Sequence, residues 1–263
     1  MSALAKRLIE RKNKGQKGLI IYLTAGYPDM ETTLEAVLAA EEAGADLIEI
    51  GIPFSDPIAD GPVIQKAATE AIKAGATTAK ALDLIKKIRA KSMIPLAAMT
   101  YTNTILHYGP AAFMRDFGAA GMNGVIVPDL PLEEADLLAG VCKEQAIDLI
   151  QFIAPTSTPE RINAVSKVAS GFVYCISTTG VTGVQAVNYQ PIAAAIEIAR
   201  KTIDIPVAIG FGIGTPVAAR QAAKYADAVI VGSAVVKQVG TIGVTGVKDL
   251  VQAIRTELDR EGD

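Results

Sequence analysis

The chain has 263 residues, half of them hydrophobic, with a single histidine and a formal net charge of −3. That length suits one large α/β barrel or two small domains, and the absence of a basic block makes nucleic acid an unexpected partner. The charged first seventeen residues lack the apolar core of a signal peptide, and no apolar run is long enough to span a bilayer, so we expect a cytoplasmic chain without a membrane anchor.

Apolar runs that end at Gly or Pro alternate with segments of helical periodicity along the whole chain. Ser2 is placed to cap a first helix that runs to Lys12. The predicted strands are 18–24, 45–51, 94–101, 123–127, 146–153, 171–176, 205–210 and 226–231. The predicted helices after them are 31–44, 63–73, 78–90, 111–117, 133–145, 158–168, 192–201, one that begins at 215–216, and 247–257.

About eight strands in alternation with helices, at this length, predict an α/β fold of the (β/α)8 TIM-barrel type in a single domain, 1–263. We expect an extra N-terminal helix and extra short helices after the second and eighth strands. A doubly wound open sheet is the alternative, but no GxGxxG motif follows the first strand.

The stretch 45–62 carries two carboxylates at opposite ends of one proline-rich loop. Because side chains alternate along a strand, Glu49 shares one face with Leu47 and Gly51. Burial at the end of a strand raises the pKa of a carboxyl group, which is how a general acid is made at neutral pH. Asp60 follows in the loop. Either carboxylate alone is typical of an ion pair or a turn, whereas the two together favour acid–base chemistry.

Glycines follow the predicted seventh and eighth strands, where barrels commonly bind phosphate through backbone N–H groups. Gly210, Gly212 and Gly232 permit close approach of an anion, and Ser233 adds a hydroxyl donor. The alternative is that these glycines only form tight turns. Their occurrence after both strands favours a phosphorylated small substrate.

No spacing of His and Cys predicts a metal site. We interpret His107 as a loop residue. Cys142 falls in a predicted helix and Cys175 in a predicted strand, without CxxC spacing, which indicates buried, reduced thiols.

The segment LIEIGIPFSDPIADGPVIQ at 47–65 resembles the signature of the tryptophan synthase alpha subunit family. Further matches occur in order along nearly the whole chain. They are YLTAGYP at 22–28, MTYTN at 99–103, VPDLP at 127–131, GVTG at 180–183, GFG at 210–212 and VGS at 231–233.

This resemblance implies a (β/α)8 barrel that cleaves indole-3-glycerol phosphate to indole and glyceraldehyde 3-phosphate in a retro-aldol reaction. It implies that Glu49 is the general acid/base that protonates the indole ring carbon, and that Asp60 holds the indole N–H and stabilises the indolenine cation. The implied substrate-binding residues are Tyr22, Ile64, Thr100, Tyr101, Tyr174, Thr182, Gly183, Gly210, Phe211, Gly212, Gly232 and Ser233.

The resemblance also implies a partner, a beta subunit that binds pyridoxal phosphate (PLP) and converts the indole to tryptophan in an alpha2-beta2 heterotetramer. The alpha chain itself is expected to need no cofactor. Phe54, Asp56 and Pro57 match the loop that faces the beta subunit, and the loop around Thr182 matches a second mobile segment. Gln185 stands where many members have Arg, which affects the expected loop-closing contacts and not the chemistry.

Three other functions are compatible with parts of this pattern. A stand-alone lyase that releases free indole would share every motif. A non-catalytic activator of a beta subunit is disfavoured because Glu49 and Asp60 are both present. A different phosphosugar enzyme, such as an isomerase, is disfavoured by the indole-sized pocket and the loop that carries Asp60.

Overall fold

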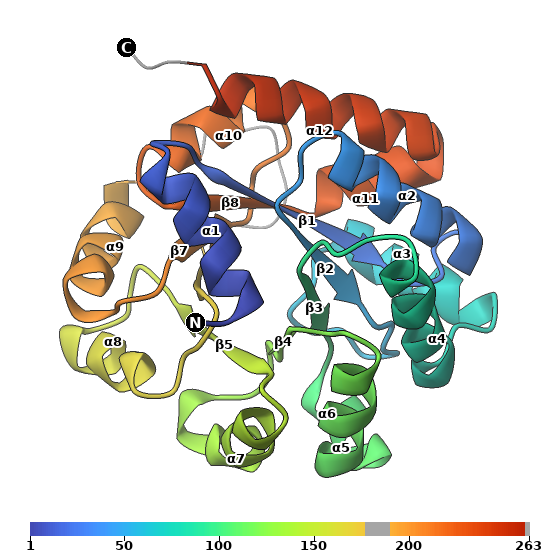
Figure 1. Cartoon of the computed structure of the whole chain (residues 1–263), viewed down its shortest axis with the longest axis horizontal. Coiled ribbons are helices and arrows are strands. Elements are labelled where there is room, and N and C mark those ends of the chain that lie inside the picture. Colours follow the sequence, from blue (N-terminus) through green and yellow to red (C-terminus); the bar gives the residue numbers. More distant parts are fainter. Residues whose placement is uncertain (177–189, 261–263) are drawn as a thin grey trace.

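Eight parallel strands close into a barrel in the order β1 to β8, as the sequence predicted (Figure 1). The structure, a computed structural model, describes residues 1–176 and 190–260. The strands are β1 Gly18–Thr24, β2 Leu47–Gly51, β3 Leu96–Met99, β4 Gly124–Ile126, β5 Asp148–Ile153, β6 Val173–Ile176, β7 Val207–Gly210 and β8 Ala228–Val231.

A ring of helices surrounds the strands, and the N-terminal helix α1 crosses the barrel on the near side in Figure 1. The helices are α1 Ala3–Asn13, α2 Met30–Glu42, α3 Pro62–Lys73, α4 Thr78–Arg89, α5 Thr102–Tyr108, α6 Pro110–Ala119, α7 Asp136–Glu144, α8 Pro159–Ser166, α9 Gln190–Thr202, α10 Pro216–Ala223, α11 Ser233–Thr241 and α12 Val244–Leu258, with a 3-10 turn η1 at Leu132–Glu134. The extra helices expected before β1 and after β2 and β8 are therefore present.

Local sequence signals set many of these boundaries. The Ser2 hydroxyl accepts a hydrogen bond from the backbone N–H of Ala5 at 3.3 Å, and Thr158 and Thr215 cap α8 and α10 in the same way. Gly44 has a φ of +101°, a left-handed conformation that glycine adopts without strain, and it follows the end of α2. These predicted starts and stops are confirmed.

The alternation along the strands separates two hydrophobic layers. Leu47 lies with Ile20, Ala97 and other inward-facing residues inside the barrel, whereas Ile48 and Ile50 pack between the strands and the helices. Leu4 and Leu8 of α1, both fully buried, belong to the inner cluster. The helix α1 therefore closes the N-terminal end of the barrel. A functional site is expected at the opposite end, where the strands have their C-termini.

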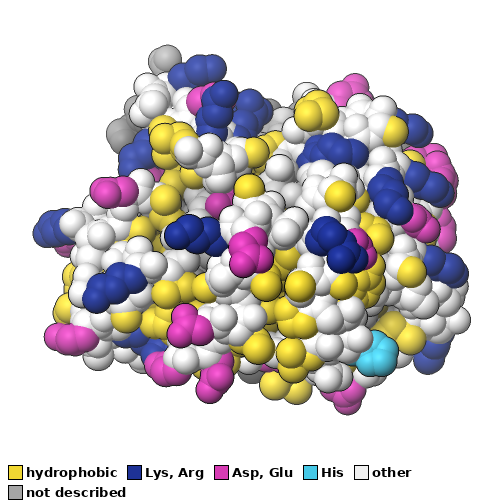
Figure 2. Space-filling model, turned by 60° about the horizontal axis from the view of Figure 1, so that its bottom comes forward, with side chains coloured by type: hydrophobic (Ala, Val, Ile, Leu, Met, Phe, Trp, Pro, Cys, Tyr) yellow, Lys and Arg dark blue, Asp and Glu magenta, His cyan; other side chains and the backbone are white. Residues whose placement is uncertain are grey.

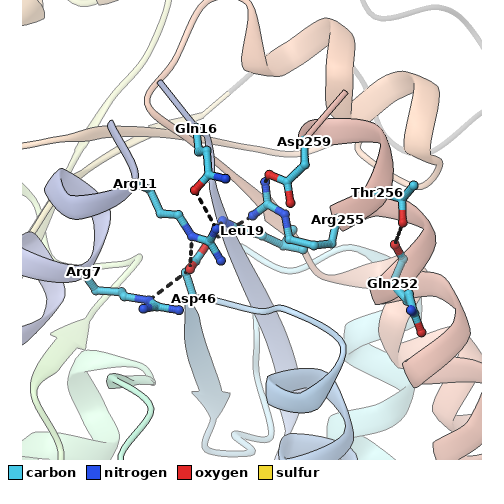
Figure 3. A network of polar contacts seen from close by, with 9 residues as sticks. All are labelled: Arg7, Arg11, Gln16, Leu19, Asp46, Gln252, Arg255, Thr256 and Asp259. Atoms are coloured by element: carbon cyan, nitrogen blue, oxygen red, sulfur yellow. Dashed lines mark hydrogen bonds and ion pairs between the residues drawn. The ribbon is translucent and has the colours of Figure 1, made fainter. Parts of the chain in front are cut away.

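Asp46 anchors this closed end (Figure 3). It immediately precedes β2, is fully buried, and pairs with Arg7 and Arg11 of α1 and with Arg255 of α12, at 3.0, 2.7 and 3.2 Å. Its second oxygen also accepts the backbone N–H of Leu19 at 3.0 Å. The Asp46 carboxylate thus joins α1, the plug helix at this end of the barrel, to the first two strands and to α12.

Two predictions on local structure are wrong. His107 is not a loop residue, because it lies on the exposed side of α5, which begins directly after β3 at Thr102. The last helix begins at Val244 and not near 247. The sequence gives no clear sign of α5, because this helix is short and has only one buried residue, Ile105, too few for a clear helical period.

The surface carries charges of both signs, consistent with the small net charge. On the face in Figure 2, Lys and Arg side chains are interspersed with Asp and Glu, with apolar areas between them. Among the residues that the structure describes, no helix is long and apolar enough to cross a membrane.

Candidate active site

Glu49 projects into the barrel near the C-terminal end of β2. It is paired in register with Tyr22 of β1 and Ala97 of β3, and only 1% of its surface is exposed. Its Oε1 atom makes no hydrogen bond to any residue in the described part of the chain. Burial raises the pKa of this carboxyl group to about 8. Glu49 therefore keeps its proton at neutral pH and is suited to act as a general acid.

Asp60 is held at the same end of the barrel by Tyr101, the residue two positions after the end of β3. The Tyr101 hydroxyl donates to Asp60 Oδ2 at 2.9 Å and accepts the backbone N–H of Ala59 at 3.1 Å. Burial raises the pKa of Asp60 to about 6, and the hydrogen bond from Tyr101 opposes that rise. Asp60 is therefore mostly ionised at neutral pH, the opposite state from Glu49.

The loop between β2 and α3 is fixed at two further points. Phe54 stacks on Tyr101 with ring centroids 5.2 Å apart, and the side-chain amide of Gln65 donates to the Asp60 carbonyl at 2.9 Å. The outer part of the loop, by contrast, is exposed: Asp56 is exposed, and 82% of the Ile58 surface is accessible. The inner half positions the carboxylate, while the outer half is available to a partner.

Tyr22 of β1 and Tyr174 of β6 add two phenol groups to the polar lining of the site. Burial first, and then the charge of Asp60, raise the pKa of Tyr22, with a smaller contribution from Glu49. For Tyr174 on β6, burial is followed by the charges of Glu49 and Asp60. These mutual effects place the two carboxyl groups and the two phenols within electrostatic range of one another.

Two strand-end glycines make room for these phenols, a role that the sequence did not suggest for Gly51. A Cβ atom at Gly51 would collide with the Tyr22 hydroxyl, and one at Gly210 would collide with that of Tyr174. Each Gly is therefore needed for a specific side chain of the adjacent strand, in addition to any part in a turn.

Apolar side chains form the rest of the lining. Tyr22 packs with Ile64 and Met99, and Phe152 of β5 lies 5.2 Å from Tyr174 between ring centroids. Met99 and Phe152 are additions to the predicted site. The period-two alternation of their strands would have identified them, since Phe152 shares the inner face with Ile150. Thr100 is buried, and its hydroxyl has no hydrogen-bond partner among the described residues.

The glycine-rich ends of β7 and β8 lie next to each other. Phe211 and Gly212 have φ angles of +87° and +73°, so the β7 loop turns sharply at that point. A Cβ at Gly214 would lie 3.6 Å from Ala234 of α11. The first turn of α11, which begins at Ser233, is thus beside this loop, and the first N–H groups of a helix have no partner within it.

Gly232 connects the two parts of the site. A Cβ at Gly232 would lie 3.6 Å from Tyr22 and 3.7 Å from Ile64, so the start of α11 borders the aromatic pocket. Thr182, Gly183 and Gln185 lie outside the described residues. Within those residues, no group of three His, Cys, Asp or Glu side chains is placed to hold a metal ion.

Comparison with known proteins identifies the family of this chain. The family model for the tryptophan synthase alpha chain matches residues 8–259. The tryptophan synthase alpha chain of Synechococcus elongatus is 47% identical over 262 residues, which cover 99% of this chain and 98% of that one. The chain belongs to the tryptophan synthase alpha chain family.

Solved structures of the family have the same fold. A tryptophan synthase structure from Mycobacterium tuberculosis superposes with a TM-score of 0.91 at 37% identity, with 99% of each chain covered. The alpha subunit from Legionella pneumophila gives 0.90 at 32% identity, with 99% of this chain and all of that one covered. The predicted barrel and lyase class are confirmed. In this family the alpha chain needs no cofactor, and PLP belongs to the beta subunit.

Proposed function

We propose that this site cleaves indole-3-glycerol phosphate to indole and glyceraldehyde 3-phosphate, with Glu49 and Asp60 as the catalytic pair. The observation that supports this best is their opposite protonation: burial gives Glu49 a pKa of about 8 and Asp60 one of about 6. Pairs of carboxyl groups whose environments separate their pKa values commonly divide the roles of acid and base.

In the proposed mechanism, the protonated Glu49 carboxyl transfers its proton to the indole ring carbon that carries the glycerol phosphate side chain. The ring nitrogen of the resulting indolenine is cationic, and the ionised Asp60 accepts its N–H hydrogen bond. The side-chain hydroxyl then loses its proton to the Glu49 carboxylate as the carbon–carbon bond breaks. The bonding electrons return to the ring, so Glu49 ends protonated and neutral indole leaves.

The remaining residues bind the substrate in this proposal. Tyr22, Ile64, Thr100, Tyr101, Tyr174 and Thr182 would surround the indole and glycerol parts. The start of α11 with Gly232 and Ser233, together with Gly183, Gly210, Phe211 and Gly212, would bind the phosphate, because helix N-termini favour anions. The adjacency of the Gly214 turn to Ala234 supports this grouping for the described residues.

The proposed partner is a tryptophan synthase beta subunit in an alpha2-beta2 heterotetramer. The loop that carries Phe54, Asp56 and Pro57 supports this surface as the contact, because its outer part, with Asp56 and the 82% exposed Ile58, is exposed. We further propose that residues 1–263 act as one domain in the cytoplasm, which the two unpaired, buried cysteines support.

The test is incubation of the pure chain with indole-3-glycerol phosphate while indole is measured, with and without a beta subunit. We expect the chain to release indole slowly on its own and faster when the beta subunit is present. Allosteric coupling of this kind is typically ~5–150-fold. Full activity that a beta subunit leaves unchanged would support the stand-alone lyase, and no indole under either condition would refute the proposed reaction.

A further inference from the structure

A second pocket, of about 340 Å³, lies at the base of the barrel, at the opposite end from Glu49. It is lined by Lys12, Gly15, Gln16, Lys17, Arg200 and Asp227. These residues come from the end of α1, the turn into β1, the end of α9 and the residue before β8.

The one carboxylate in this pocket already has its full set of partners. Asp227 Oδ1 contacts Lys12 Nζ at 3.2 Å and Arg200 Nη2 at 3.2 Å, while Oδ2 accepts the backbone N–H of Val207 at 3.0 Å. Asp227 is only 4% exposed. Three cationic side chains thus surround a single anion, which leaves an excess of two positive charges in the pocket.

The other polar groups of the pocket are donors. Gln16 Oε1 accepts from Arg11 Nη1 at 2.9 Å, which leaves the N–H groups of its amide for another acceptor. Lys17 Nζ donates to the Ala226 carbonyl at 2.8 Å and has two more N–H groups to donate. Burial, followed by the charge of Arg200, lowers the pKa of Lys17, which indicates that these cations repel one another.

We propose that this pocket binds a phosphate dianion, either free or as a small phosphate monoester. A dianion would neutralise the two excess charges and accept hydrogen bonds from Lys12, Lys17, Gln16 and Arg200. The planar guanidinium of Arg matches the geometry of phosphate oxygens. The volume is large compared with the ~30 Å³ of one water, so a phosphate with a short organic group fits.

The experiment is a titration of the full-length chain, labelled with ¹⁵N, with inorganic phosphate, glycerol 3-phosphate and chloride at matched ionic strength. The amide of Gly15 is the reporter, because Gly15 lines this pocket and the space beside it is open to a ligand. We expect saturable shifts of Gly15 with phosphate and not with chloride. Stronger binding of glycerol 3-phosphate than of phosphate would identify a monoester as the ligand, and equal binding would identify the free ion.

Matched variants separate this site from the proposed phosphate site at Ser233. Arg200→Gln should weaken the phosphate affinity read from the Gly15 shift by about tenfold or more, since a hydrogen bond to a charged group is lost. Lys12→Gln should weaken this affinity as well, and because 54% of the Lys12 side chain is exposed we expect that variant to fold. The control Lys14→Gln removes the same charge from a neighbouring exposed position that does not line the pocket. Shifts confined to Gly232 and Ser233, or equal losses in all three variants, would overturn the proposal.

Discussion

A carboxyl group can act as a general acid only if it still holds its proton at the working pH, and the surroundings of Glu49 achieve this through burial alone. Among the residues that the structure describes, no cation is paired with Glu49 and its Oε1 has no hydrogen-bond partner. The same burial is unfavourable for folding once the unfolded chain is ionised. Function and stability therefore oppose each other at this one residue.

The first prediction is that Glu49→Gln lowers turnover by ~10²–10⁴-fold, the usual contribution of general acid–base catalysis, while substrate binding persists. The stability of the wild type should also fall, relative to the variant, between pH 4.5 and about 8. In that range the unfolded chain loses the Glu49 proton and the folded chain keeps it. Urea unfolding at pH 5 and pH 8.5 measures this. An equal difference in unfolding free energy between the wild type and the variant at both pH values would contradict this prediction.

The second prediction concerns the pH dependence of kcat/KM. Activity should rise as Asp60 ionises near pH 6 and fall as Glu49 loses its proton near pH 8. Tyr101→Phe removes the hydrogen bond that favours ionised Asp60, so the acidic limb should move to higher pH while the basic limb stays. Phe54→Leu, which removes the stacked ring and keeps the hydroxyl, is the control. A fixed acidic limb in Tyr101→Phe would refute the role given to Tyr101.

At the scale of elements, the β7 and β8 loops depend on backbone conformation. Gly212 has a φ of +73°, which is strained for a β-branched residue, and Phe211 already occupies the same region at +87°. Gly214, in the same loop, is not among the left-handed glycines, and a Cβ there would make an ordinary contact with Ala234. The two glycines therefore offer a matched pair of positions.

The third prediction is that Gly212→Val weakens glyceraldehyde 3-phosphate binding by about tenfold or more, as expected for a strained residue of about 1–3 kcal/mol in the binding loop. Indole binding should change little, because the aromatic pocket is formed by other segments. Gly214→Ala should bind both ligands normally. Calorimetric titration with each ligand decides the matter, and equal losses of phosphate and indole affinity would place the phosphate elsewhere.

Periodicity and caps were sufficient to predict the barrel and the location of Glu49, because both follow from local rules. The strand face of Glu49 came from alternation, and the starts of α8 and α10 came from Thr158 and Thr215. The pairings of Gly51 with Tyr22 and of Gly210 with Tyr174 could not be predicted. They are steric matches between strands, and a single sequence contains no signal for such contacts.

At the scale of the whole molecule, the chain holds its site at one end by closing the other. The plug helix α1 inserts Leu4 and Leu8 into the inner core, and Asp46 ties that helix to β2 and α12 through three arginines. Asp227 makes a similar connection before β8, where it joins α1 to α9. Residues that are far apart in the sequence thus meet at the N-terminal end of the barrel. Their ion pairs stabilise the barrel without involving the residues of the site.

The last prediction is that Asp46→Asn destabilises the chain by about 3–5 kcal/mol, since removing one partner of a buried ion network leaves the other charges uncompensated. Arg255 is the partner most affected, because only 9% of its side chain is exposed. The control is Glu42→Gln, which breaks an exposed pair of α2 with α12 at Lys248 and should change stability by less than about 1 kcal/mol. Urea unfolding gives both values. Hydrogen exchange should show α1 opening more often in Asp46→Asn, whereas unchanged protection of α1 would mean that Leu4 and Leu8 hold the plug without the ion network.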